Sequence, residues 1–288
     1  MTFDDLLDRF YFYDCEIFAH DSLFVFISYR TKEKFVFHNS KPNDFQEFID
    51  KYKPILVGYN NNSYDKYMLK FSLLGYTPEE LKRANDYIIS GGNGWEYDNS
   101  YMQLPTQVDL INCIVPRKSL KELEGNIRLN ITETTVPFDL PTKWTQEQYE
   151  EVLYYCTCDV EALFPIFEML KTRFISKFII AKIGKMDYEY ALSLTDANLT
   201  AKLLGAERQE HDDPFKYEYP DIIDKSKIPK KALDYFDDLI EHNDLEYKVE
   251  APCLDMKTMD FQLGVGGSHG FCKDNVFSYD RGDVLKCE

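Results

Sequence analysis

The stretch Phe10-Tyr11-Phe12-Tyr13-Asp14-Cys15-Glu16-Ile17-Phe18 is rich in aromatic residues and predicts a β-strand. Because residues i and i+2 of a strand point to the same face, Asp14 and Glu16 hold two carboxylates side by side. Such carboxylates repel each other unless a positive charge lies between them, and hard divalent cations prefer oxygen ligands. With 50 acidic residues in the chain, an Asp-x-Glu pair also arises by chance, so the interpretation as a metal site depends on further positions.

The segments around this strand predict an α/β fold. Strand-like runs at residues 23–29 and 34–38 follow it and predict an antiparallel meander. Further along the chain we expect helices at 42–52, 64–74 and 145–174, short strands at 55–59 and 108–110, and a loop at 90–100. Strands first and then alternating strands and helices predict a mixed β-sheet flanked by helices, the general layout of ribonuclease-H-like nucleases.

The composition changes after Asp187, where polar and proline-containing stretches and a basic run at residues 225–231 begin. We therefore expect one domain at 1–185 and a smaller C-terminal α+β extension at 186–288. The glycines of Gly264-Val265-Gly266-Gly267-Ser268-His269-Gly270 predict a tight β-hairpin in that extension.

The bulk properties limit the class of protein. A net charge of -17 argues against binding nucleic acid by nonspecific charge alone, although bound metal ions would supply positive charge where phosphate must sit. The seven cysteines and five histidines show no metal-ligand spacing, and no signal peptide or membrane-length apolar run is present. We expect reduced thiols, no membrane partner and a cytoplasmic location.

Two more acidic positions strengthen the metal-site hypothesis. Asp65 follows an Asn-rich turn that leaves a predicted buried strand, so it lies in the first turn of the next helix. Tyr155 and Asp159 are four residues apart on a predicted helix and therefore share one face. Taken singly, each has a plainer interpretation: a helix cap for Asp65, a core tyrosine for Tyr155 and an exposed acid for Asp159.

Together, the Asp-x-Glu strand, the Asn-x-x-Tyr-Asp turn and the Tyr-x-x-x-Asp helix resemble, in this order, the motifs of the proofreading 3′–5′ exonuclease domain of family B DNA polymerases. The phage-type members are most similar, and the resemblance covers residues 10 to about 175. The Gly-rich run and Asp283-Val284-Leu285 resemble the hairpin that leads into the polymerase palm. Neither palm carboxylate motif is present, so the resemblance implies no polymerase activity for this chain.

The resemblance implies roles for the acidic residues. Asp14, Glu16 and Asp159 would hold one Mg²⁺ or Mn²⁺, and Asp14 with Asp65 would help to hold a second. Two such ions roughly 3.5–4 Å apart activate a water and stabilise the leaving 3′-oxygen. Tyr155 would orient that water or the scissile phosphate.

The resemblance also implies contacts with the substrate. Asn61 would hydrogen-bond the terminal nucleotides, and Tyr64 or Tyr59 would stack on unpaired bases. Lys143 stands where related polymerases carry a phosphate-contacting lysine, although the local match is poor. A basic patch that could contact DNA is formed by Arg117, Lys118 and Lys121.

The leading hypothesis is a metal-dependent exonuclease that shortens single-stranded DNA from its 3′ end, as the N-terminal part of a split or truncated phage-like polymerase. Its expected partners are the DNA 3′ end and a separate subunit with palm, fingers and thumb. Two alternatives stay open: a docking module for such a subunit with an idle nuclease site, and a stand-alone RNA-trimming exonuclease.

Overall fold

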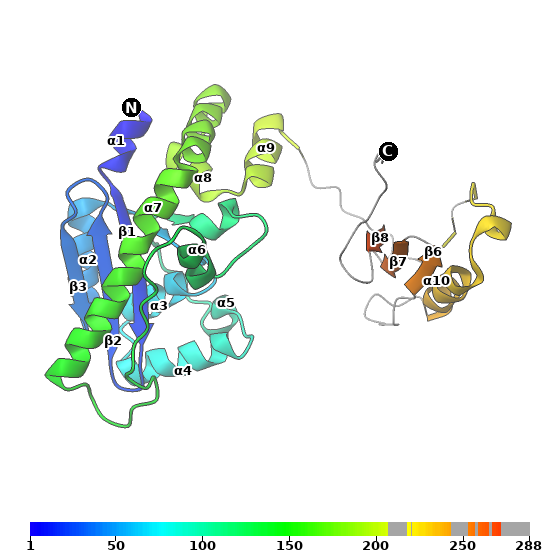
Figure 1. The fold of residues 1–288 in the computed structure, drawn as a ribbon. Helices are drawn as coiled ribbons and strands as arrows, with labels where there is room; N and C mark the ends of the chain where they lie inside the picture. The colour runs from blue at the N-terminus through cyan, green and yellow to red at the C-terminus, as the bar shows by residue number, and fades with distance from the viewer. Residues whose placement is uncertain (207–217, 220, 243–252, 257–258, 265–266, 272–288) are drawn as a thin grey trace. The chain divides into compact units, whose positions relative to one another are not determined.

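The structure of the chain, a computed structural model, describes residues 1–206, 218–219, 221–242, 253–256, 259–264 and 267–271 (Figure 1). The chain divides into two compact units, Met1–Glu207 and Arg208–Glu288. In the described part of the chain, no helix is both long enough and apolar enough to cross a membrane.

The first unit contains an open five-stranded sheet in the order β3-β2-β1-β4-β5. Its strands are β1 (Phe10–Ile17), β2 (Ser22–Ser28), β3 (Lys34–His38), β4 (Ile55–Gly58) and β5 (Gln107–Asp109). The first three strands form the predicted antiparallel meander, whereas β4 runs parallel to both β1 and β5. The predicted mixed sheet is therefore confirmed, and each predicted strand agrees with the structure to within one residue at either end.

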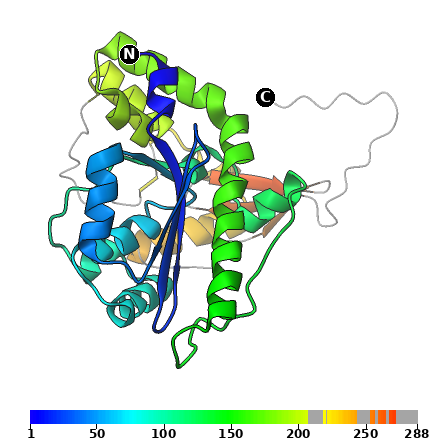
Figure 2. The same cartoon turned by 90° about the vertical axis from the view of Figure 1, so that its left-hand side faces the viewer.

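Strand β1 lies at the centre of the sheet because both of its faces are apolar. Phe10 and Phe12 pack on one face with the core beneath helix α7 (Gln146–Gly184). Tyr11 and Tyr13 pack on the other, against α2 (Pro42–Tyr52), α3 (Asp65–Leu73) and α4 (Pro78–Ile89). Figure 2 shows α7 and α2 on opposite sides of the sheet. The remaining short elements of this unit are α1 (Phe3–Leu7), α5 (Gly94–Tyr97), η1 (Leu110–Cys113), α6 (Leu120–Asn126), α8 (Tyr188–Ser193) and α9 (Asp196–Leu204).

The long helix α7 begins as its sequence predicts and ends later. Thr145 and Gln148 form the expected capping box. The helix spans 39 residues, continues through Pro165 and ends at Gly184, where the following Lys185 adopts a left-handed conformation. The expected end near residue 174 is wrong, because apolar side chains beyond it, including Phe178 and Ala181, remain buried against the core.

The prediction of a loop at residues 90–100 is partly wrong, and helix α4, which precedes this segment, was not predicted. Helix α4 begins at a capping box of Thr77 and Glu80 with a proline in its first turn. The short helix α5 lies inside the glycine-rich segment, where Glu96 accepts the backbone N–H of Asn93 at 3.2 Å. These two helices form part of the wall of the candidate site.

Helices α8 and α9 pack with the first unit, which therefore extends beyond the composition change near residue 186. Glu189 of α8 accepts a hydrogen bond from Thr106 Oγ1 at 2.9 Å and forms an ion pair with Arg9. Asp196 of α9 pairs with Arg173 at 2.6 Å. A functional division at 185/186 stays a prediction.

The second unit contains η2 (Lys225–Lys227), α10 (Lys230–His242) and the antiparallel strands β6 (Cys253–Met256), β7 (Met259–Gly264) and β8 (Gly267–Phe271). Strands β7 and β8 pair Gly264 with Gly267, which confirms the hairpin predicted for the Gly-rich run. The likeness of Asp283-Val284-Leu285 to a polymerase palm lies outside the described residues.

Candidate metal centre

One cleft of about 720 Å³ brings together the acidic residues that the sequence marks. It is lined by Asp14 and Glu16 of β1, Asp65 of α3, and Tyr155 and Asp159 of α7. These residues come from three elements that are far apart in the sequence.

The turn after β4 directs Asp65 toward this cleft. β4 ends at Gly58, and the chain then turns through Asn60, which has a left-handed φ of 60°. A side chain at position 58 would place its Cβ 2.7 Å from the Cβ of Asn61, so this turn requires glycine. Asp109 at the end of β5 fixes the turn by accepting the backbone N–H groups of Asn60 and Asn62 at 2.7 and 3.1 Å.

Burial and mutual repulsion dominate the electrostatics of the cleft. Glu16, Asp65 and Asp159 are buried, and burial is the largest cause that raises the pKa of each of them. For Asp14, burial and then the charges of Asp65 and Glu16 hold the pKa well above its ordinary value. Burial raises the pKa of Asp65 to about 6 although the Cys15 thiol, which donates to its Oδ1 at 3.2 Å, opposes the rise. The cluster therefore favours protonation unless positive charge is supplied.

Lys121 of α6 supplies part of that charge. Its ammonium group forms an ion pair with Asp159 and lies 3.5 Å from an oxygen of the buried Glu124. The same charge partly opposes the raised pKa values of Glu16 and Asp159. The basic-patch residue predicted from sequence is thus part of the carboxylate cluster.

Tyr155 keeps its proton in this environment. Burial, followed by the charges of Glu16 and Asp159, raises the pKa of its phenol far above the ordinary value. The Lys121 ammonium lies 5.0 Å from the centroid of its ring. The phenol therefore favours its protonated form, which can donate a hydrogen bond inside the cleft.

Four aromatic side chains also line the cleft: Tyr59, Tyr64, Tyr67 and Trp95. The hydroxyl of Tyr64 donates to Asn85 Oδ1 and that of Tyr59 donates to the carbonyl of Lys118, both at 2.6 Å, so these two rings are held in place. Trp95 is 58% exposed. An aromatic surface of this kind suits unpaired bases, which stack on flat rings whatever their identity.

Of the four predicted substrate residues, Tyr64 lines the cleft and Lys121 meets it only through its ion pair with Asp159, whereas Asn61 and Lys143 lie elsewhere. Asn61 is fully buried beneath the cleft, where its amide donates to Gln107 Oε1 at 2.9 Å and to the Tyr13 hydroxyl at 3.4 Å. Lys143 is exposed in the segment before α7. Neither is among the described residues that line the cleft. Their contacts with DNA stay predictions.

The structure adds Cys156 and Trp95 to the site, and sequence reasoning missed both. Cys156 follows Tyr155 on α7, and its Sγ lies 3.9 Å from Asp14 Oδ2. Cysteine spacing could not reveal it because its neighbours are the acids of β1. Trp95 could have been found from the Asn93–Glu96 capping pattern, which places a short helix in the glycine-rich segment.

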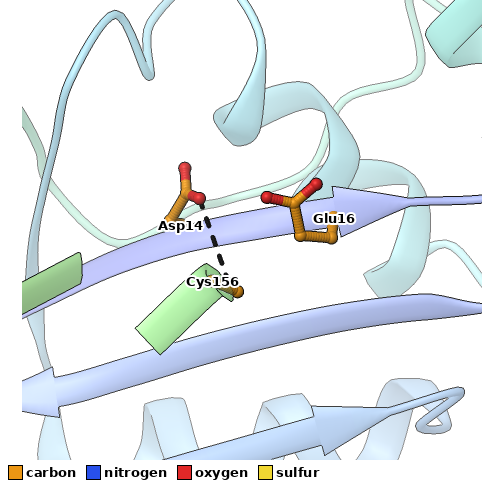
Figure 3. Close-up of side chains that lie close together, drawn as sticks. All are labelled: Asp14, Glu16 and Cys156. Carbon is orange, nitrogen blue, oxygen red and sulfur yellow. Dashed lines mark hydrogen bonds between the residues drawn. The ribbon is translucent and has the colours of Figure 1, made fainter. Parts of the chain in front are cut away.

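The donor set fits divalent cations. Four carboxylates, with room left for water, match the oxygen ligands that Mg²⁺ and Mn²⁺ prefer. Within the cluster, ligand atoms of Asp14, Glu16 and Cys156 all lie within 4.8 Å of one another and could hold a metal ion (Figure 3).

Comparison with family models, with curated proteins and with solved structures finds no match to this chain.

Proposed function

We propose that this chain is a metal-dependent exonuclease that removes nucleotides from the 3′ end of single-stranded DNA, built on a ribonuclease-H-like sheet. The observation that carries the proposal is the convergence of Asp14, Glu16, Asp65 and Asp159 on one cleft. The specificity for a 3′ end rests on the resemblance of the three motifs.

The energetic argument for metal binding comes from the raised pKa values of these acids. Burying carboxylates near one another costs free energy, and Lys121 provides only one positive charge against four acids. Divalent cations would offset that cost and hold the acids ionised. When bound, Mg²⁺ or Mn²⁺ supplies Lewis-acid activation of a water and neutralises phosphate charge.

The protein's own groups would position the substrate. The protonated Tyr155 phenol can donate to a phosphate oxygen or to a water at the carboxylate cluster. Tyr64 and Trp95 offer rings for unpaired bases near the chain end. Since the chain carries a net charge of -17, we expect DNA to bind weakly without metal ions.

The test is digestion of a 5′-labelled single-stranded oligonucleotide with Mn²⁺, which should give a ladder of products shortened from the 3′ end. Asp14→Ala plus Glu16→Ala should abolish it. Glu150→Ala plus Glu161→Ala is the matched control, because both carboxylates are exposed on α7 and lie outside the cleft lining. Equal rates for the wild type and the β1 variant would reject the proposal.

The choice between DNA and RNA is tested with the same assay. An RNA oligonucleotide of equal sequence differs by its 2′-hydroxyls, which a protein can recognise directly. We propose DNA as the substrate, so the RNA strand should be shortened more slowly. Faster digestion of RNA would favour an RNA-trimming enzyme that uses the same cleft.

A further inference from the structure

A thiol lies inside the carboxylate cluster, and this combination is unusual for a site that uses Mg²⁺ alone. Cys156 is fully buried, and its Sγ lies 3.9 Å from Asp14 Oδ2. Figure 3 shows Cys156 of α7 beside Asp14 and Glu16 of β1. The three side chains offer one sulfur and two carboxylate oxygens within 4.8 Å of one another.

Glu16 provides an independent indication that this group meets a ligand. It is only 7% exposed and lines the cleft. Within the described part of the chain, no group donates a hydrogen bond to its carboxylate, yet its oxygens are not among the fully enclosed polar atoms that lack a partner. Its oxygens therefore open to the cleft and remain available to a cation.

We propose that Asp14, Glu16 and Cys156 form a site for a soft divalent cation, Zn²⁺ or Cd²⁺. Zinc binds thiolate sulfur at about 2.3 Å and carboxylate oxygen at about 2.0–2.2 Å. Adjacent sulfur and oxygen ligands of a tetrahedral ion are then separated by roughly 3.6 Å, so the 3.9 Å between Sγ and Oδ2 would have to shorten by only a few tenths of an ångström. Water completes the coordination shell.

The Cys156 thiol determines which metal ions the site prefers. As Sγ binds the cation, the thiol releases its proton to solvent, so the binding of each ion frees one proton from Cys156. Soft thiolate favours Zn²⁺ and Cd²⁺, whereas Mg²⁺ demands oxygen ligands. A soft ion at this position would occupy Asp14 and Glu16 and would exclude Mg²⁺. The inference goes beyond the proposed function, because it requires metal binding but no hydrolysis.

Titration of the full chain with Cd²⁺, in a reductant without thiols and with excess Mg²⁺, tests the site. A sulfur-to-cadmium charge-transfer band in the ultraviolet should grow to one equivalent. Cys156→Ser should remove the band and weaken Cd²⁺ binding on the order of 100-fold, because the soft ligand is lost. Cys158→Ser is the matched control: it lies two residues further along α7 and does not belong to the group of ligand atoms that lie within 4.8 Å of one another, so it should keep the band.

A band that persists in Cys156→Ser, or that Cys158→Ser removes equally, would overturn the inference. Cys15→Ser separates the second nearby thiol, whose Sγ contacts Asp65, and should leave the band in place. X-ray absorption of the wild type with one equivalent of Zn²⁺ tests the site without any variant. One sulfur among oxygens supports it, and a shell without sulfur overturns it. If the band behaves as expected but no DNA is digested, only the proposed function fails.

Discussion

Two regions of the first unit bury carboxylates, and they differ in the hydrogen-bond partners that they offer to them. Asp21, next to β2, is 2% exposed and is surrounded by hydrogen-bond partners. Its oxygens lie 2.9 Å from His38 Nε2, 2.7 Å from Asn39 Nδ2 and 2.9 Å from the backbone nitrogen of Trp144. Glu16 is almost as buried, yet no described residue donates a hydrogen bond to it.

The difference separates a carboxylate whose charge the protein satisfies from one that could hold a metal ion. Asp21 ties β3 and the start of α7 to the end of β1, so the protein itself satisfies its charge. At the cleft the acids face one another, and the ion pair between Lys121 and Asp159 offsets only part of their charge. The protein's own groups therefore compensate the cleft acids only in part, as expected for acids that would bind cations.

The largest expected effect comes from neutralising a cleft acid. Asp14→Asn should lower the exonuclease rate roughly 1,000-fold, about 4 kcal/mol of transition-state stabilisation. The same change removes repulsion with Asp65 and Glu16, so the metal-free protein should become more stable by about 1 kcal/mol. Single-turnover digestion and urea unfolding measure the two quantities. If Asp14→Asn lowered both activity and stability, Asp14 would stabilise the fold as Asp21 does, and the two regions would not differ.

The pH dependence of stability is the next largest effect. The pKa of Asp65 is raised from 3.8 to about 6 in the folded protein. The folded state therefore favours the protonated acid, so this contribution is fully present below pH 4 and is lost as the pH rises through about 6. The shift corresponds to about 3 kcal/mol.

Asp65→Asn isolates this effect. In the absence of metal, the stability of the variant relative to the wild type should increase between pH 4 and pH 7 in urea unfolding. Mn²⁺ should stabilise the wild type much more at pH 7.5 than at pH 5, since cations bind the ionised acid. A difference between variant and wild type that does not change with pH would contradict the raised pKa.

Substitution of Asp21 should have the opposite effect to Asp14→Asn: it should lower stability and leave the exonuclease rate nearly unchanged. Asp21→Ala leaves its nitrogen partners on His38, Asn39 and Trp144 without an acceptor, which should lower the free energy of unfolding by about 2 kcal/mol. The exonuclease rate of the folded fraction should stay within about twofold of the wild type, because Asp21 is not among the residues that line the cleft. Asp50→Ala, an exposed acid of α2, is the control and should change neither quantity. A rate loss comparable to that of Asp14→Asn would show that the two regions are not distinct.

The sequence predicted the cleft carboxylates because each sits on a regular element. The period of two on β1 places Asp14 and Glu16 on one face, and the helical repeat places Tyr155 and Asp159 on another. The order of the strands then brings these faces together. Asp65 followed from the expectation that ligands bind at the carboxyl ends of parallel strands.

The sequence failed where side-chain direction depends on an irregular turn or on a distant partner. Asn61 follows Asn60 in a left-handed conformation, which turns its side chain down against Gln107. The ion pair of Lys121 with Asp159 joins residues 38 positions apart, so no local pattern reports it. The contact between Cys156 and Asp14 spans 142 positions.

The smallest effect is expected on the aromatic wall, and it tests whether the cleft is a substrate site as well as a metal site. Trp95 is 58% exposed and lines the cleft, so Trp95→Ala should leave folding nearly unchanged. If its ring stacks on an unpaired base, KM for a single-stranded oligonucleotide should rise about fivefold, near 1 kcal/mol, with kcat unchanged. Tyr101→Ala is the control, because Tyr101 is 88% exposed but lies outside the described cleft lining. Equal KM values for both variants would show that the Trp95 ring does not bind the substrate. A rise for Trp95→Ala alone would mean that the cleft acids lie beside a surface that binds nucleotides.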